Sequence, residues 1–243
     1  MSEYLYKRVL IKISGEALSA HQNSTHSSDI YNSKIVHDIA KDLGNVAHHG
    51  VQLAVVIGGG NILRGQKIST DFSIDRSTAD TMGMLATIIN ALALQSALEA
   101  HGARCRVLSG IAMSSVCEPF VRRRAIRHLE KGRIVIFAAG TGNPYFTTDT
   151  AAALRALEIE ADVLLKATNV SGVFCSDPTT NPEAVFYENL TYQQAIDQNL
   201  QVMDSTAFTL LRDSKMPMKV FSVHAEHSVH HVLLGKGQFT SIS

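Results

Sequence analysis

The sequence has few of the features that mark secreted, disulfide-stabilised or membrane-spanning proteins. Its three cysteines, Cys105, Cys117 and Cys175, are odd in number and form no Cys-x-x-Cys pair, which is typical of free thiols in a reducing compartment. Charged residues divide the first apolar stretch, so we expect no signal peptide. The apolar stretch 82–100 contains Asn90 and other polar residues, which favours a buried helix over a membrane span. We therefore expect a cytoplasmic protein that binds no membrane.

The sequence also lacks an excess of charge of either sign. Lysine and arginine total 22, aspartate and glutamate total 22, and the formal net charge is zero, so no overall basic field predicts binding to nucleic acid. Hydrophobic residues make up 45% and charged residues 18% of the 243 residues, which is typical of a globular protein with a sizeable core. Because no repeat, low-complexity tract or linker divides the chain, we expect a single domain over residues 1–243.

Short apolar runs alternate with longer segments of helical periodicity along the chain. The runs that we expect to form strands are residues 9–14, 52–57, 104–108, 134–138, 162–166 and 220–223. Helical patterns lie around 35–46 and at 77–101, 120–130 and 148–156. Most of the strand runs are almost continuously apolar, which is typical of strands covered on both faces. The alternation therefore predicts an α/β fold with a mostly parallel sheet between helical layers.

Three glycine-containing segments directly follow predicted strands. They read "KISG" at residues 12–15, "GGGNILRG" at 58–65 and "GTGNPYFTTD" at 140–149. Ligands of parallel α/β sheets bind at the carboxyl ends of the strands, so we expect these segments to border one crevice. The sequence contains neither a Walker loop nor the dinucleotide-binding glycine pattern.

Several side chains in these segments suit a phosphate site, and each also has a structural explanation. The glycines at 58–60 either expose backbone amides to an anion or only make a tight turn. Lys12 lies in an apolar strand, where its ammonium group reaches an anion or snorkels to the surface. Asp149 opens a predicted helix as a cap or as a partner of cations, and Arg64 could bind phosphate oxygens. A lysine and an aspartate in one crevice favour phosphate chemistry more than either alone.

Other positions leave similar alternatives open. Asp80 follows Ser77 by three residues at the start of a predicted helix, so it forms a capping box or accepts ribose hydroxyl groups. Phe174 stacks on a base or belongs to the core, and the local sequence favours the core. Four histidines lie in the segment 224–231 without a metal-binding spacing. The basic stretch 121–133 is typical of a solvated helix face, with an interface or anion site as the minority interpretation.

Five segments of the chain closely resemble the bacterial-type uridylate kinases. They read "YKRVLIKISGEAL", "VVIGGGNILRG", "TADTMGMLATIINALALQSALE", "AAGTGNPYFTTDTAAALRALEIEADVLLKAT" and "GVFCSDP". The order is that of the family over nearly the whole chain, and the GTGNP-x-FTTD segment is specific to it. The resemblance implies the amino-acid-kinase fold, a three-layer α/β/α sandwich with a mostly parallel central sheet, and assembly as a homohexamer. It also implies transfer of a phosphoryl group from ATP to UMP, with Mg²⁺ bound to ATP.

The resemblance also implies roles for individual residues. The residues at ATP-binding positions are Lys12, Ile13, Ser14, Gly15, Gly60, Arg64, Thr168, Phe174 and Asp177. Those at UMP-binding positions are Gly59, Asp80, Thr141, Gly142, Asn143, Pro144, Tyr145, Phe146, Thr147 and Thr148. Three residues are expected to be catalytic, since Lys12 and Arg64 would neutralise phosphate charge and Asp149 would orient the cations. Lys166 is a candidate second cation and Asp204 a candidate metal ligand, but we expect no protein carboxylate as a firm metal ligand.

One segment departs from the family pattern. Residues 19–33 contain no glycine, whereas the family usually has a glycine-rich segment there that is associated with activation by GTP. We therefore expect GTP to activate this protein weakly or not at all. Two other functions stay open: phosphorylation of a carbamate or an amino-acid carboxylate by the same fold, and nucleotide binding without catalysis. Asp80 and the segment 141–148 favour a nucleotide acceptor, and Lys12 with Asp149 favours catalysis.

Overall fold

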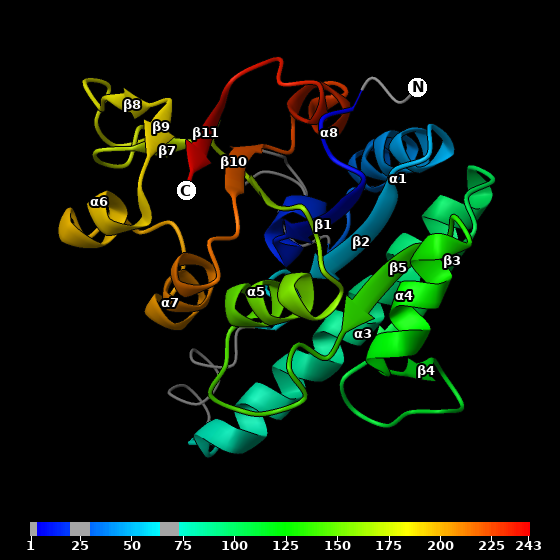
Figure 1. The fold of residues 1–243 in the computed structure, drawn as a ribbon. Coiled ribbons are helices and arrows are strands. Elements are labelled where there is room, and N and C mark those ends of the chain that lie inside the picture. Colours follow the sequence, from blue (N-terminus) through cyan, green and yellow to red (C-terminus); the bar gives the residue numbers. More distant parts are fainter. Residues whose placement is uncertain (1–3, 20–29, 64–72) are drawn as a thin grey trace.

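A nine-stranded sheet forms the centre of the computed structural model, which describes residues 4–19, 30–63 and 73–243 (Figure 1). Its strands are β1 (Arg8–Ile13), β2 (Gln52–Ile57), β3 (Cys105–Ser109), β4 (Glu118–Pro119), β5 (Ile134–Ala138), β6 (Val163–Thr168), β9 (Asn189–Leu190), β10 (Met218–Ser222) and β11 (Phe239–Ile242). They are ordered β4-β3-β5-β2-β1-β6-β10-β11-β9. Every neighbouring pair is parallel except β10 and β11. A separate antiparallel pair consists of β7 (Val173–Phe174) and β8 (Phe186–Tyr187).

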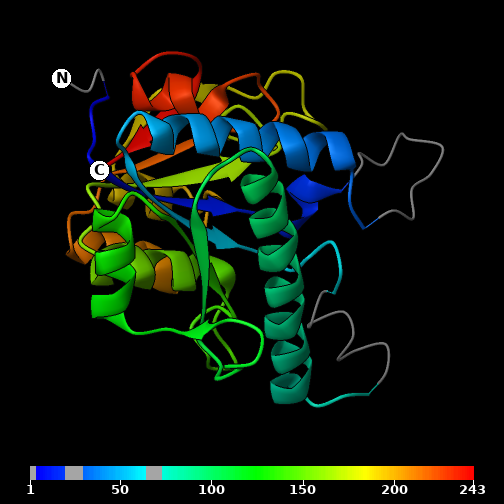
Figure 2. The ribbon, with the colours of Figure 1, turned by 90° about the vertical axis from the view of Figure 1, so that its right-hand side faces the viewer.

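Helices cover both faces of this sheet. On one face pack α1 (Ser33–His48), α3 (Arg76–Ala100) and α8 (Ser228–Leu233), and on the other α4 (Arg122–Glu130), α5 (Thr148–Glu158), α6 (Tyr192–Asp197) and α7 (Ser205–Asp213). Figure 2 shows α1 and α8 above the sheet and α4 and α5 below it. The predicted three-layer sandwich with a mostly parallel sheet is therefore confirmed.

Alternation along the strands divides the core into two halves. On β1, Val9 and Ile11 belong to the core under α1 and α3, whereas Leu10 belongs to the core under α4 and α5. Successive side chains of a strand point to opposite faces. Lys12 therefore points to the same side as Leu10, toward the layer that contains α5.

The predicted elements differ from the observed ones mainly at their ends. Each of the six expected strands is present, with bounds shifted by two residues or fewer. The helix expected from residue 120 begins at Arg122, because the Phe120 N–H donates to the Ser109 carbonyl and continues β4 instead. The histidine segment forms only the six-residue α8, which His227 precedes in a left-handed conformation with φ of 52°. The elements α6, α7 and β11 were not predicted.

Within the described residues, α3 is the one helix with the length and apolar composition to cross a membrane. Half of its most apolar window is buried inside the protein. Leu94 and Leu98 are fully buried in the core beside α1. This packing agrees with the expectation of a buried helix for residues 82–100.

Candidate active site

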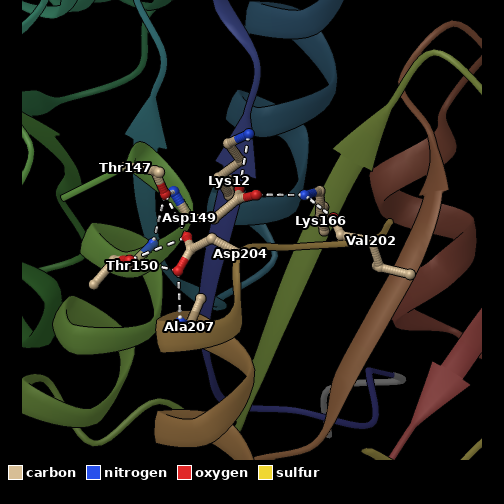
Figure 3. Close-up of polar contacts among 8 residues, drawn as sticks. All are labelled: Lys12, Thr147, Asp149, Thr150, Lys166, Val202, Asp204 and Ala207. Atoms are coloured by element: carbon tan, nitrogen blue, oxygen red, sulfur yellow. Dashed lines mark hydrogen bonds and ion pairs between the residues drawn. The ribbon is translucent and has the colours of Figure 1, made fainter. Parts of the chain in front are cut away.

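Two lysines lie side by side on adjacent strands and share one carboxylate. β1 and β6 pair in parallel with Lys12 opposite Lys166. Lys12 Nζ lies 2.9 Å from Asp149 Oδ1, and Lys166 Nζ lies 2.7 Å from Asp149 Oδ2 (Figure 3). The Lys166 ammonium group also donates to the carbonyl of Val202. The site thus carries one net positive charge from these three side chains, which suits an anionic ligand.

The start of α5 holds Asp149 in this position. Thr147 is the N-cap residue, and its Oγ1 accepts from the N–H groups of Asp149 at 3.1 Å and Thr150 at 3.2 Å. A carboxylate in the first turn also complements the positive end of the helix. Capping by Asp149 itself, one of the two explanations from the sequence, is therefore wrong, because Thr147 is the cap.

Burial shapes the protonation of the cluster. The side chains of Lys12, Asp149 and Lys166 are only 12%, 15% and 10% exposed. Burial alone would raise the pKa of Asp149, but the charges of Lys12 and Lys166 outweigh it and hold that pKa below its ordinary value. Burial lowers the pKa of Lys166, the Asp149 charge opposes this effect, and the Lys12 charge adds to it. An aspartate with a lowered pKa is a poor proton acceptor, so its chemistry here is orientation of cations.

Asp204 joins the starts of α5 and α7. It is the N-cap of α7, and its Oδ1 accepts from the Ala207 N–H at 2.9 Å. The Thr150 hydroxyl lies 2.9 Å from Oδ1 and 3.0 Å from Oδ2, and the Thr147 hydroxyl donates to Oδ2 (Figure 3). Protein donors therefore engage both of its oxygens.

The loop after β2, here called the glycine loop (residues 58–61), packs tightly on the loop after β1. A Cβ atom added to Gly15 would lie 2.5 Å from Asn61 Oδ1 and 2.7 Å from Gly60 N. A Cβ added to Gly58 would lie 2.9 Å from Gly15 N. These distances leave no room for a side chain at Gly15 or Gly58. The packing of the two loops therefore explains both glycines, whether or not a ligand binds there. At Gly59 and Gly60 the closest contacts of an added Cβ are 3.0 Å, which is tight but leaves both glycines less constrained.

The loop after β5, here called the threonine loop (residues 139–147), has several left-handed residues. Ala139, Gly140, Gly142 and Tyr145 have φ values of 58°, 56°, 82° and 71°. A Cβ on Gly142 would also lie 2.5 Å from the carbonyl oxygen of Gly110, in the loop after β3. Backbone geometry therefore explains the glycines of "GTGNP", and Gly110 is a contact that the sequence did not reveal.

The threonine loop leads from β5 into α5, whose first turn contains Asp149. Thr141 Oγ1 accepts from the Asn143 N–H at 3.1 Å, Pro144 follows, and Thr148 begins α5. Tyr145 and Phe146 are 68% and 51% exposed. Aromatic side chains this exposed are available to contact a planar ligand.

Asp80 of α3 binds the threonine loop instead of capping its own helix. The N-cap of α3 is Asp75, whose carboxylate accepts from the Thr78 N–H at 3.0 Å. The predicted capping box of Ser77 and Asp80 is therefore wrong. Asp80 Oδ2 accepts from the Tyr145 N–H at 2.8 Å, and both of its oxygens lie 2.8 Å from Nε of Arg76.

The remaining predicted ATP-binding residues lie at the ends of β1 and β6 and in or after β7 of the separate strand pair. Ile13 and Ser14 lead from β1 into a short 3₁₀ helix (Gly15–Leu18), and the Ile13 carbonyl accepts from the Gly58 N–H at 2.9 Å. Thr168 ends β6, Phe174 packs edge-on against Phe186 with ring centroids 5.3 Å apart, and Asp177 accepts from the Thr179 N–H at 2.9 Å. No hydrogen bond or ion pair joins Thr168, Phe174 or Asp177 to the two lysines in the part of the chain that the structure describes. Arg64 and residues 20–29 lie outside the described residues.

A cavity of about 520 Å³ adjoins the cluster. Asp149 and Lys166 line it together with Met203 and Phe208 of the α6–α7 region. It therefore combines charged groups with apolar surface, as nucleotide pockets do.

The histidine segment 224–231 and the basic stretch 121–133 do not belong to this site. Within the described residues, no group of three or more His, Cys, Asp or Glu side chains is placed to hold a metal ion. On α4, Arg122 pairs with Glu160 at 2.5 Å and Arg124 with Glu118 at 3.6 Å. The four side chains of these pairs are between 34% and 68% exposed, so this part of the stretch is the solvated helix face that was expected.

Comparison with known proteins identifies the class of enzyme. The sequence model of the amino acid kinase family matches residues 7–222, so the chain belongs to the amino acid kinase family. Within it, the uridylate kinase of Methylococcus capsulatus is 52% identical over 235 residues, which cover 97% of this chain and 96% of that protein. The uridylate kinase of Xanthomonas oryzae pv. oryzae is 52% identical over 236 residues, with 97% and 96% covered.

Solved structures agree. The crystal structure of UMP kinase from Ureaplasma parvum matches with a TM-score of 0.90 and 40% identity, and covers 98% of both chains. The uridylate kinase of Archaeoglobus fulgidus matches with a TM-score of 0.73 and 28% identity, over 97% of this chain and 99% of that one. The resemblance to bacterial-type uridylate kinases and the amino-acid-kinase fold are therefore confirmed.

Proposed function

We propose that this protein is a uridylate kinase that transfers the γ-phosphoryl group of ATP to UMP, forming ADP and UDP. The observation that carries the proposal is the bridge of Lys12, Asp149 and Lys166 at the strand ends, in a chain 52% identical to uridylate kinases over 97% of its length. Phosphoryl transfer needs positioning and charge stabilisation more than protein covalent chemistry. Two buried ammonium groups fixed by one carboxylate supply both.

The roles of the residues follow from their positions. Lys12 and Lys166 stabilise charge on the transferred phosphoryl group, and Asp149 fixes the distance between their ammonium groups. The cavity beside Lys166 is the candidate donor pocket, with the glycine loop on the phosphates. Arg64, which lies outside the described residues, is assigned to the phosphates by the family resemblance alone. The threonine loop is the candidate acceptor site, with Tyr145 and Phe146 available to the uracil base. Asp80 would exchange its contact with Arg76 for a ribose hydroxyl.

We propose that Mg²⁺ enters the site with ATP. The Asp204 oxygens are engaged by Thr147, Thr150 and Ala207, and the Asp149 oxygens by two lysines. Mg²⁺ keeps several water ligands and is commonly held by substrate phosphates with one or two carboxylates, so a site whose carboxylates are engaged fits an ion carried by the nucleotide. When bound, the ion neutralises charge on the β- and γ-phosphates.

A panel of acceptors tests the proposed function. With ATP and Mg²⁺, ADP release should be at least tenfold faster with UMP than with AMP or GMP, because the threonine loop matches uridylate kinases throughout. The reaction should stop when Mg²⁺ is chelated and resume when it is restored. Comparable rates with a purine monophosphate, a carbamate or an amino acid would assign the chain to another kinase of this fold. No turnover with any acceptor would identify a nucleotide-binding protein without catalysis.

We propose that the chain assembles as a homohexamer, and one face of α3 offers a contact between copies. Leu85, Ile89 and Leu92 follow one another at spacings of four and three residues and are 40%, 52% and 36% exposed. Such a stripe on a long helix is suited to pack against the same stripe of a second copy.

The oligomeric state should respond to charge on this stripe. Light scattering of the wild-type protein should give six times the 26.4 kDa of one chain. Ile89→Asp should give a smaller species, because a carboxylate in an apolar helix contact is strongly unfavourable. Val185→Asp is the matched control, since Val185 is exposed and apolar but lies outside α3. An unchanged hexamer in Ile89→Asp would place the interface elsewhere.

GTP should activate the enzyme less than twofold. The prediction rests on the sequence of residues 19–33, which has no glycine, and residues 20–29 lie outside the described part. Effector coupling requires GTP to bind two states of the enzyme with different affinity, and a rebuilt segment removes that difference. Initial rates at subsaturating ATP with and without GTP measure it, and several-fold activation would contradict it.

Two broader expectations remain proposals. One sheet includes strands from β1 to β11, which supports a single domain over residues 1–243. Cys105, Cys117 and Cys175 are free thiols, which supports a cytoplasmic location. Limited proteolysis that released a stable half would contradict the first proposal, and localisation of a tagged chain to the periplasm would contradict the second.

A further inference from the structure

Two buried polar side chains of α3 hold the backbone of the two loops that border the active site. Thr87 and Asn90 are 5% and 0% exposed. They lie three residues apart and therefore project from the same face of the helix. Thr87 contacts the threonine loop and Asn90 contacts the glycine loop. One rigid element thus fixes both loops.

Thr87 fixes the point at which the threonine loop leaves β5. Its Oγ1 accepts from the N–H of Ala139 at 2.7 Å and donates to the carbonyl of Met84 at 2.7 Å. Ala139 is fully buried and has a φ of 58°, which a residue with a side chain rarely adopts. Its N–H needs an acceptor, because a buried N–H without one is unfavourable. The hydroxyl of Thr87 therefore stabilises the strained turn from which the loop starts.

Asn90 holds the glycine loop through hydrogen bonds from its side-chain amide. Its Nδ2 donates to the Gly58 carbonyl at 2.7 Å and to Asn61 Oδ1 at 2.7 Å. Its Oδ1 accepts from the Tyr31 hydroxyl at 2.8 Å and from Asn61 Nδ2 at 3.3 Å. An asparagine amide has two donors and two acceptor sites, and here all four are used.

The hydrogen bonds of Asn90 also affect the loop that follows β1. Asn61 Oδ1, which Asn90 holds, is the atom that an added Cβ on Gly15 would approach to 2.5 Å. Asn61 Nδ2 also donates to the Ile30 carbonyl at 3.0 Å. Movement of Asn61 would therefore change the contact between the glycine loop and the loop that follows Lys12.

We infer that Thr87 and Asn90 are positioning residues that set the two nucleotide sites separately. Thr87 acts on the acceptor site through Ala139, and Asn90 acts on the donor phosphates through Gly58 and Asn61. Both side chains are buried, and their hydrogen bonds go to other groups of the protein. The inference rests on the proposed function, since it takes the threonine loop as the main part of the UMP site and Gly60 of the glycine loop as part of the ATP site. Gly59, at a UMP-binding position, packs directly on α3, where an added Cβ would lie 3.0 Å from Ala86 Cβ.

The test compares Michaelis constants for the two substrates in the full-length enzyme. Thr87→Val keeps the shape and removes the hydroxyl, and it should raise the KM for UMP about tenfold while the KM for ATP stays within twofold. Asn90→Asp keeps the shape and removes the amide donors, and it should raise the KM for ATP about tenfold while the KM for UMP stays within twofold. Thr87→Ser restores the hydroxyl and should restore the KM for UMP.

Tyr31→Phe serves as a milder variant should Asn90→Asp fail to fold, because it removes a single hydrogen bond to Asn90. It should raise the KM for ATP two- to threefold and leave the KM for UMP unchanged. Equal changes in both constants, or lower melting temperatures with both constants unchanged, would show that the two residues only stabilise the fold and would overturn the inference. The wild-type enzyme is assayed alongside. Absence of UMP phosphorylation by the wild type would instead refute the proposed function.

Discussion

Replacing Lys12 with methionine should lower kcat for UMP phosphorylation by about 10²- to 10³-fold, the loss typical of deleting one preorganised group at a developing charge. Methionine preserves the unbranched shape of the side chain but carries no charge. The fold should survive, because Asp149 keeps its ion pair with Lys166 at 2.7 Å. The loss should therefore occur in turnover and not in melting temperature.

Two control variants make this result specific. Lys131→Met removes the charge of an exposed lysine at the end of α4 and should leave kcat unchanged. Lys12→Arg keeps the charge but replaces a compact ammonium group with a planar fork, so it should recover only part of the activity. A kcat of Lys12→Met within tenfold of the wild type would contradict a role for Lys12 in charge stabilisation.

The convergence of the strand-end loops could be predicted from the sequence. Apolar runs that end in glycine-rich segments indicate parallel strands, and their carboxyl ends share one edge. Lys12 and Asp149 were accordingly expected in one crevice, and the structure brings them to 2.9 Å. Lys166 could only be a candidate, because its position depends on β1 pairing with β6. These strands are more than 140 residues apart in sequence, and nothing local specifies that they are neighbours.

Other features were ambiguous because two physical causes leave the same trace in a sequence. In a sequence, a glycine that exposes its amide to phosphate cannot be distinguished from a glycine that lets a neighbouring backbone approach closely. Only the observed contact between Gly15 and Gly58 shows that close approach applies here. Asp75 and Ser77 are both good N-cap residues, and the sequence does not show which of them caps α3. The structural alternative for Asp80, a capping box with Ser77, was therefore wrong. The role of Thr87 was not predicted, although a polar residue on the buried face of an apolar helix usually indicates a hydrogen bond to a buried group.

Replacing Asp149 with asparagine should have the largest effect on stability, about 3–5 kcal/mol, which is typical of removing one partner from a buried ion pair. Without the carboxylate, the ammonium groups of Lys12 and Lys166 face each other from adjacent strands with no anion between them. Their side chains are only 12% and 10% exposed, so water screens the repulsion poorly. Turnover should fall as well, because the lysines lose the group that orients them.

The dependence on pH separates the charge of Asp149 from its shape. Its pKa lies below the ordinary value of 3.8 in the folded protein. The carboxylate therefore contributes stability that is fully present above pH 3.8 and is lost as the pH falls through the lowered pKa. Urea unfolding should accordingly show a difference between wild type and Asp149→Asn that is constant near neutral pH and shrinks in acid. A difference that stays constant into acid would attribute the loss to packing instead of charge.

A double variant distinguishes stability from catalysis at the same site. Asp149→Leu combined with Lys166→Met removes the shared carboxylate and one of its two cations, and replaces them with apolar groups. Because apolar residues often substitute for a buried ion pair at little cost, the double variant should regain the stability that Asp149→Asn loses to repulsion between the two ammonium groups. The part of the loss that comes from leaving Lys12 without its anion should remain. It should remain inactive, since Lys12 has lost both the second cation, Lys166, and the carboxylate of Asp149 that orients its ammonium group. Recovery of stability without activity would show that the lysine–aspartate–lysine bridge is retained for chemistry, whereas recovery of both would remove Asp149 and Lys166 from the mechanism.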